Sequence, residues 1–178
     1  MTSLEAHLQS VRISGLDRGP VVAFFDLDRT LIAGYSILAL AMETAQTAAR
    51  RGQWRQSVKV AGDLLKHKVD GSGSNYHRVV RRTSRALTGI SEEALTRLGQ
   101  QAYRKHLAKN LYREAIALVE AHRAAGHKLV IVSAASRYQI EPVARVLGIE
   151  EICCTRLEVV DGRFTGQVIA PLCYGEGK

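Results

Sequence analysis

The sequence lacks any apolar run that reaches the roughly 18 residues needed to span a bilayer. Its first residues also lack the basic and apolar regions of a secretion signal, so we expect a cytoplasmic chain. Cysteines are few and odd in number, three in all, and Cys153 and Cys154 stand in an apolar, strand-like stretch. This setting favours buried, reduced thiols over a disulfide framework or a metal pair.

Acidic residues are also scarce, because 17 Asp and Glu face 25 Lys and Arg, which gives a formal net charge of +8. The six histidines show no zinc-ligand spacing, and only 6% of the residues are aromatic. With no helix-turn-helix spacing and few rings to stack bases, the composition argues against nucleic acid as a partner. At 178 residues and 46% hydrophobic, the chain can bury the core of a single globular domain.

Two carboxylates and a threonine follow the first strand pattern. Residues 21–25 are all apolar, without the gaps of a helical pattern, which is typical of a strand buried on both faces in a parallel sheet. Asp26, Asp28 and Thr30 come next, where open α/β sheets bind ligands. Residues two apart in an extended segment point the same way, so both carboxylates and the backbone N–H groups at Leu27 can face one centre.

This spacing suits phosphoryl transfer. One carboxylate can attack phosphorus and form an aspartyl-phosphate, while the other moves a proton. A divalent cation would offset the repulsion between the attacking anion and the phosphate, and Mg²⁺ prefers such ligands. Taken alone, the pattern also fits acidic residues and a threonine that only form a turn or cap a helix.

A second strand pattern and a hairpin follow later in the chain. Residues 128–132 again end in a small polar residue, Ser133, whose hydroxyl can hold a phosphate oxygen. Residues 155–170 have the pattern of a β-hairpin that turns at Asp-Gly, and the sequence closes at Lys178.

In this order, the motifs resemble the haloacid dehalogenase superfamily of phosphatases, specifically its phosphoserine phosphatase-like branch in subfamily IB. The resemblance covers about residues 20–178. It implies an α/β fold, with a Rossmann-like parallel-sheet core and an inserted all-helical cap domain. By motif position, it also implies a nucleophile, a general acid/base, a phosphate ligand and a charge neutraliser, which would be Asp26, Asp28, Ser133 and Lys178 respectively.

The same resemblance implies a cofactor and a substrate class. Mg²⁺ would be bound by the Asp26 carboxylate and the Asp28 carbonyl, and the substrate would be a small phosphorylated molecule. Thr30 would steady the loop after the nucleophile. The residues expected to contact substrate are Leu27, Thr30, Ala134, Arg81 and Arg82.

Two features depart from the family pattern. Tyr35 stands nine residues after Asp26, where phosphoserine phosphatases of the family carry a glutamate that meets the substrate amine, which disfavours phosphoserine. The fourth family motif, an acidic Gly-Asp-x-x-x-Asp segment, would follow Lys178, where the sequence stops. We therefore expect a truncated chain with weak or no turnover and a core incomplete at its carboxyl end. Its first strand would be an open edge, to be covered by a missing C-terminal segment or a dimer partner.

Hydrophobic periodicity divides the chain into an arm, a core and a cap. Residues 1–18 mix polar residues with glycine and predict a flexible arm. Residues 19–34 and 108–178 would form the core. Residues 35–107 carry helical repeats, including one over 54–65, and predict the helical cap. A lid inserted there would exclude water and shape specificity.

One expected cap helix carries a basic stripe formed by Arg78, Arg81, Arg82 and Arg85. The simplest interpretation is a solvated outer face, and the alternatives are contact with an anionic substrate or with an acidic membrane surface. The second function that we weigh is therefore a non-catalytic binding or regulatory module. Such a module would belong to a phospholipid-biosynthetic protein fused to an acyltransferase.

Overall fold

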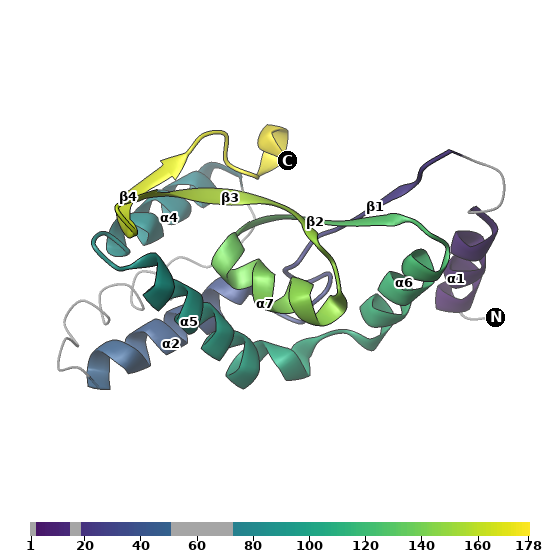
Figure 1. Cartoon of the computed structure of the whole chain (residues 1–178), viewed down its shortest axis with the longest axis horizontal. Helices are drawn as coiled ribbons and strands as arrows, with labels where there is room; N and C mark the ends of the chain where they lie inside the picture. The colour runs from purple at the N-terminus through teal and green to yellow at the C-terminus, as the bar shows by residue number, and fades with distance from the viewer. Residues whose placement is uncertain (1–2, 15–18, 51–72) are drawn as a thin grey trace.

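The computed structural model describes residues 3–14, 19–50 and 73–178, so the helix expected over 54–65 lies outside the described residues. Figure 1 shows the helices α1 (Ser3–Ser14), α2 (Ser36–Arg50), α4 (Gly73–Ala86), α5 (Glu92–Ala102), α6 (Arg113–Ala124) and α7 (Arg137–Leu147). Three short helical turns are η1 (Tyr103–Leu107), η2 (Ala108–Asn110) and η3 (Gly175–Gly177). The strands are β1 (Val22–Phe25), β2 (Lys128–Ser136), β3 (Glu151–Val160) and β4 (Arg163–Ile169).

The strands form one sheet in the order β1-β2-β3-β4. The first three strands are parallel and β4 is antiparallel to β3, which confirms the predicted α/β core. Asp161 and Gly162 form the turn between β3 and β4, with φ values of 48° and 70°. Two successive residues with positive φ are typical of the two-residue turns that close hairpins, so the Asp-Gly turn is as predicted.

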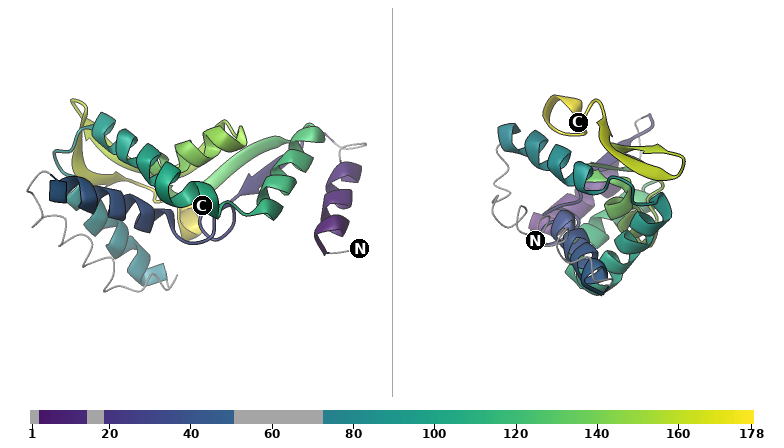
Figure 2. Two further views of the ribbon diagram at one scale, coloured as in Figure 1. Left: turned by 90° about the horizontal axis from the view of Figure 1, so that it is seen from below. Right: turned by 90° about the vertical axis from the view of Figure 1, so that its left-hand side faces the viewer.

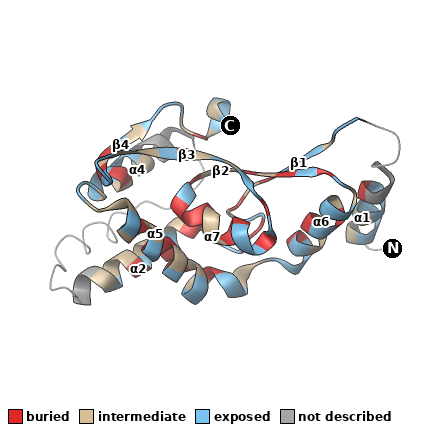
Figure 3. Cartoon of the chain, viewed as in Figure 1, coloured by how far each residue is buried: buried red, intermediate tan, exposed pale blue. Residues whose placement is uncertain are grey.

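Helices α6 and α7 cover one face of this sheet (Figure 1). Right-handed crossovers that step from β1 to β2 to β3 in one direction place their helices on the same side. On β1, Ala23 and Phe25 are 8% and 9% exposed, whereas Val22 and Phe24 are 40% and 67% exposed (Figure 3). The prediction that this strand is buried on both faces is therefore wrong for the described residues, while its position at the sheet edge is as expected.

The N-terminal stretch contains a helix rather than only an extended arm. Helix α1 packs against α6 at one end of the molecule, as two of the views show (Figures 1 and 2). Val11 is buried, at 5% exposure. The expectation of a flexible arm over residues 1–18 is thereby corrected for Ser3–Ser14.

The cysteines are free thiols. Cys173 is buried and Cys154 is partly buried, but Cys153 is exposed, which corrects the expectation for that residue. Neighbouring residues of a strand point to opposite faces, so two adjacent cysteines on β3 cannot share one environment.

Helices α2, α4 and α5 lie between β1 and β2, within residues 35–107 where a helical cap was expected. Ser91 caps α5, since its Oγ accepts a hydrogen bond of 3.2 Å from the N–H of Ala94. Within the described part of the chain, no helix combines the length and the apolar character that a membrane span requires.

A buried carboxylate fixes α2 to the short helix η1. Glu43 accepts hydrogen bonds from Lys105 Nζ at 2.7 Å and contacts His106 Nε2 at 2.9 Å. Burial opposes its ionisation, but these two contacts prevail and lower the pKa of Glu43. These contacts hold α2, the helix that forms one wall of the cavity described below.

Gly99 allows α5 and α7 to approach closely. A Cβ atom at this position would overlap the backbone carbonyl oxygen of Tyr138. We expect Gly99→Ala to lower the free energy of unfolding by about 1–3 kcal/mol, because the backbone must shift to admit the methyl group. Urea denaturation measures this loss. Gly19→Ala is the control, since an added Cβ there meets nothing within 4 Å. Equal stability of the two variants would contradict the close approach.

Candidate active site

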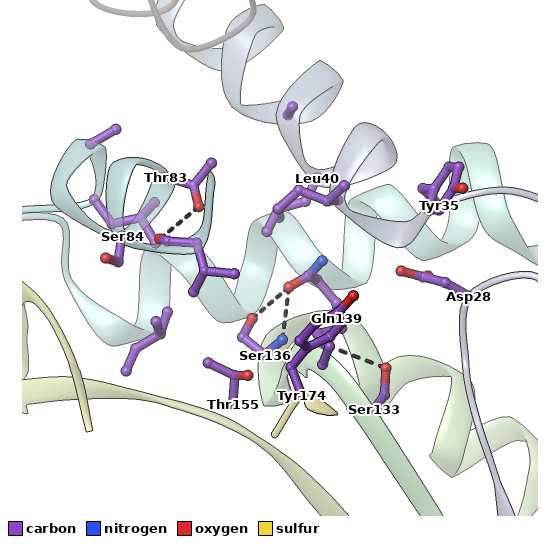
Figure 4. A pocket seen from close by; sticks show the side chains of 18 of the residues that line it. Asp28, Tyr35, Leu40, Thr83, Ser84, Ser133, Ser136, Gln139, Thr155 and Tyr174 are labelled. Atoms are coloured by element: carbon purple, nitrogen blue, oxygen red, sulfur yellow. Dashed lines mark hydrogen bonds between the residues drawn. The ribbon is translucent and has the colours of Figure 1, made fainter. Parts of the chain in front are cut away.

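The parallel pairing of β1 and β2 brings two predicted residues to one end of the sheet. Phe25 pairs with Ile131, so Asp26, which follows β1, and Ser133, near the end of β2, lie at the same end. A cavity of about 320 Å³ opens there (Figure 4). All four residues assigned to catalysis line it, namely Asp26, Asp28, Ser133 and Lys178.

A tight loop holds the two carboxylates. Leu27 is fully buried, and its carbonyl accepts hydrogen bonds from the N–H groups of Leu31 and Ile32 at 3.0 and 3.1 Å. Arg29 has a φ of 61°, which is uncommon outside glycine, and its N–H donates to the carbonyl of Gly34. Backbone in this region persists only where the surroundings fix it, as they do at many functional sites.

Asp28 lies at the N-terminus of α2. Its Oδ1 accepts a hydrogen bond of 2.8 Å from the backbone N–H of Ser36. Burial raises the pKa of Asp28 above its ordinary value of 3.8, although the hydrogen bond from Ser36 opposes this shift. The nearby Asp26 carboxylate raises the pKa further. A carboxyl group with a raised pKa can hold a proton closer to neutral pH, as a general acid requires.

Gln139 links the two helices that begin beside the site. Its Nε2 donates to Ser36 Oγ at 3.1 Å, and its Oε1 accepts from the N–H and the Oγ of Ser136 at 2.9 and 2.7 Å. All three residues are buried. Gln139 is not among the site residues predicted from the sequence, although its position three residues after Ser136 has the spacing of a capping box and was a usable signal.

Lys178 and Ser133 approach the nucleophile candidate from two other elements. Lys178 Nζ donates to Asp26 Oδ1 at 2.9 Å, and both side chains are partly exposed. Ser133 is 2% exposed, and the pairing of β2 with β3 shifts register between Ser133 and Ser136. Such an irregularity changes the direction in which side chains at the end of a strand point, and here it turns this end of β2 toward the cavity.

The structure leaves several predicted substrate contacts outside the cavity. Ala134 lines it, but the Leu27 side chain is in the core and only its backbone lies between the carboxylates. Thr30 is exposed. Arg81 and Arg82 are exposed as well, and neither is among the residues that line the cavity, so their contact with substrate stays a prediction. Helical periodicity explains this, because α4 turns its other side inward with Val80, Thr83 and Ser84, and Leu87 directly follows the helix.

In the described parts of the chain, no group of three or more His, Cys, Asp and Glu residues is arranged to hold a metal ion. Asp26 and Asp28 still provide two hard oxygen ligands in one cavity. Mg²⁺ is commonly bound by one or two carboxylates, with substrate phosphate and water completing its shell. The residues present therefore fit Mg²⁺.

Comparison with known sequences identifies related proteins. The model of the family of haloacid dehalogenase-like hydrolases matches residues 23–178. A probable phosphatase from Mycobacterium tuberculosis is 32% identical over 166 residues, which cover 90% of this chain and 55% of that protein. A phosphoserine phosphatase from the same organism is 29% identical over 175 residues, covering 94% of this chain and 56% of that protein. The chain spans about half the length of these curated relatives.

Solved structures with the same fold include a Bordetella pertussis protein of unknown function. It superimposes with a TM-score of 0.74 at 25% identity, covering 90% of this chain and 71% of that chain. A phosphoserine phosphatase, solved as an analogue of its phospho-aspartyl intermediate, has a TM-score of 0.52 at 19% identity and covers 85% and 63% respectively. These similarities confirm the fold.

The raised pKa of Asp28 predicts a stability cost at neutral pH. Between pH 3.8 and the raised value, the folded state binds more protons than the unfolded chain, so stability falls as the pH rises. Asp28→Asn keeps an acceptor for the Ser36 N–H but carries no charge. We expect this variant to have a larger free energy of unfolding than the wild type at neutral pH. The gain should disappear as the pH falls toward 3.8.

Urea denaturation at neutral and at acidic pH measures this difference. Asp161→Asn is the matched control, because Asp161 is an exposed turn residue whose backbone conformation asparagine also adopts. A wild type that is more stable than Asp28→Asn at neutral pH would contradict the expected cost.

Proposed function

This chain belongs to the haloacid dehalogenase-like hydrolases, and we propose that it is a Mg²⁺-dependent phosphomonoester hydrolase with Asp26 as its nucleophile. One observation carries this proposal. Asp26, placed by β1, and Asp28, placed by the loop that follows, share one cavity with Ser133 and Lys178. The similarity to a probable phosphatase and to a phosphoserine phosphatase supports a phosphate ester as the substrate class.

In the first step, an oxygen of the Asp26 carboxylate attacks phosphorus and the bond to the alcohol oxygen breaks. Asp28 gives its proton to the departing oxygen, for which its raised pKa is suited. In the second step, Asp28 takes a proton from water. The resulting hydroxide attacks phosphorus, which restores the Asp26 carboxylate and releases inorganic phosphate.

The remaining groups handle the charge of the phosphate. Lys178, 2.9 Å from Asp26, offsets the negative charge of both the nucleophile and the incoming phosphate. The Ser133 hydroxyl lies in the cavity wall, where it can donate to a phosphate oxygen. Mg²⁺, bound by the Asp26 carboxylate and the Asp28 carbonyl, would add positive charge where the two anions meet.

Asp26→Asn removes the nucleophile while keeping its size. We measure the binding of a phosphoryl mimic as well as turnover. With Mg²⁺, beryllofluoride should raise the Tm of the wild type by bonding to the Asp26 carboxylate, and the substitution should abolish this rise. Any hydrolysis of p-nitrophenyl phosphate should fall by roughly 10³-fold or more, as for other lost nucleophiles.

The control for this experiment is Asp161→Asn, which changes an exposed carboxylate in the β3–β4 turn that does not line the cavity. It should respond to beryllofluoride like the wild type. A Tm rise that survives Asp26→Asn would exclude Asp26 as the nucleophile and favour the non-catalytic binding module.

A further inference from the structure

The cavity is charged at one end only. Among the described residues that line it, the charged ones are Asp26, Asp28, Arg29 and Lys178. Three of them belong to the loop after β1, and Lys178 is paired with Asp26. Figure 4 shows Asp28 and Tyr35 on one side of the cavity, with Thr83 and Ser84 on the other. The phosphate end is therefore separated from an end whose described lining is uncharged.

This second end, which we call the apolar chamber, lies between α2, α4 and β3. Its apolar lining consists of Ile37, Leu40, Ala41, Val80, Leu87 and Leu157. Leu40 is 7% exposed and belongs to the hydrophobic cluster that also contains Leu95 and Phe164. The chamber wall thus continues into a packed core.

The hydroxyl groups of the chamber already have acceptors. Thr44 Oγ1 donates to the carbonyl of Leu40 at 2.8 Å, and Thr83 Oγ1 donates to that of Val80 at 2.9 Å. Ser84 Oγ lies 3.0 Å from the carbonyl of Gly166. Because these donors are committed to the backbone, the chamber gives little compensation to a charged group that loses its water.

One buried hydroxyl in the lining is different. Thr155 is 2% exposed, and its Oγ1 has no hydrogen-bond partner among the described residues. Figure 4 places Thr155 beside Ser136, between the Ser133 side and the chamber. A buried polar atom without a partner is costly, and an uncharged oxygen of a bound molecule would satisfy it.

Resting on the proposed phosphatase function, we infer that the substrate is the phosphate monoester of an uncharged, largely apolar alcohol. Its phosphate binds between Asp26 and Ser133, and its carbon skeleton fills the apolar chamber. A volume of about 320 Å³ is enough for a small organic molecule. An amino-acid phosphate is a poor fit, because its ammonium and carboxylate groups would lose water without gaining an ionic partner among the described chamber residues.

A series of alkyl phosphonates tests this inference on the unaltered chain. Isothermal titration with Mg²⁺ present compares inorganic phosphate, methyl-, butyl- and hexylphosphonate, and phosphoserine. We expect the affinity to rise about fourfold for each methylene until the chamber is full, as its burial predicts. Phosphoserine should bind no more tightly than inorganic phosphate.

Two neighbouring substitutions on α2 separate the chamber from general effects. Ala41→Asp places a charge in the chamber, and should remove the gain with chain length, so that hexylphosphonate binds this variant no more tightly than methylphosphonate does. Met42→Asp is the matched control, because Met42 is 46% exposed and does not line the cavity. It should keep the full gain. Circular dichroism checks that both variants fold. The phosphonate series on the wild type tests the inference even if a variant does not fold.

The outcomes distinguish this inference from the proposed function. If inorganic phosphate binds but the affinity does not depend on chain length, or phosphoserine binds more tightly, the apolar alcohol is wrong and the phosphatase assignment stands. If the wild type binds neither inorganic phosphate nor any phosphonate, both the proposed function and the inference are overturned.

Discussion

The parallel pairing of β1 with β2 is the constraint on which the site depends. It aligns the ends of two strands that are more than a hundred residues apart in sequence, and so places Asp26 and Ser133 at the same end of the sheet. Parallel strands need a crossover between them, and the chain uses this connection to insert α2, α4 and α5. The same connection therefore supplies α2 and α4, which form part of the cavity wall above the strand ends.

The buried position of Asp28 is expected to lower the free energy of unfolding at neutral pH. Its burial works against the charged form, and the Ser36 N–H compensates only in part. Gln139 holds Ser36 in turn, so the N-termini of α2 and α7 are joined beside one carboxylate. A site that holds a poorly solvated carboxylate in a fixed place has a lower free energy of unfolding, but it keeps a carboxyl group that is suited to proton transfer. Such a loss of stability is common at active sites.

Local sequence signals predicted the elements, because their causes are local. The β3–β4 turn at Asp161–Gly162 follows from the conformational preferences of those two residues. The exposure of Phe24 could not be predicted in this way, since it depends on which face of the sheet α6 and α7 cover. The outward direction of Arg81 likewise depends on how α4 packs. The apolar chamber also has no local pattern, because three separate elements build it.

The central claim is that Asp26 carries the phosphoryl group. The most direct measurement is to trap the protein during reaction with a phosphate ester and Mg²⁺, reduce the acyl phosphate with borohydride, and locate the reduced residue by peptide mass spectrometry. We expect reduction at Asp26, in the peptide that joins β1 to α2. Reduction at another residue, or an unmodified Asp26 while the ester is hydrolysed, would contradict it.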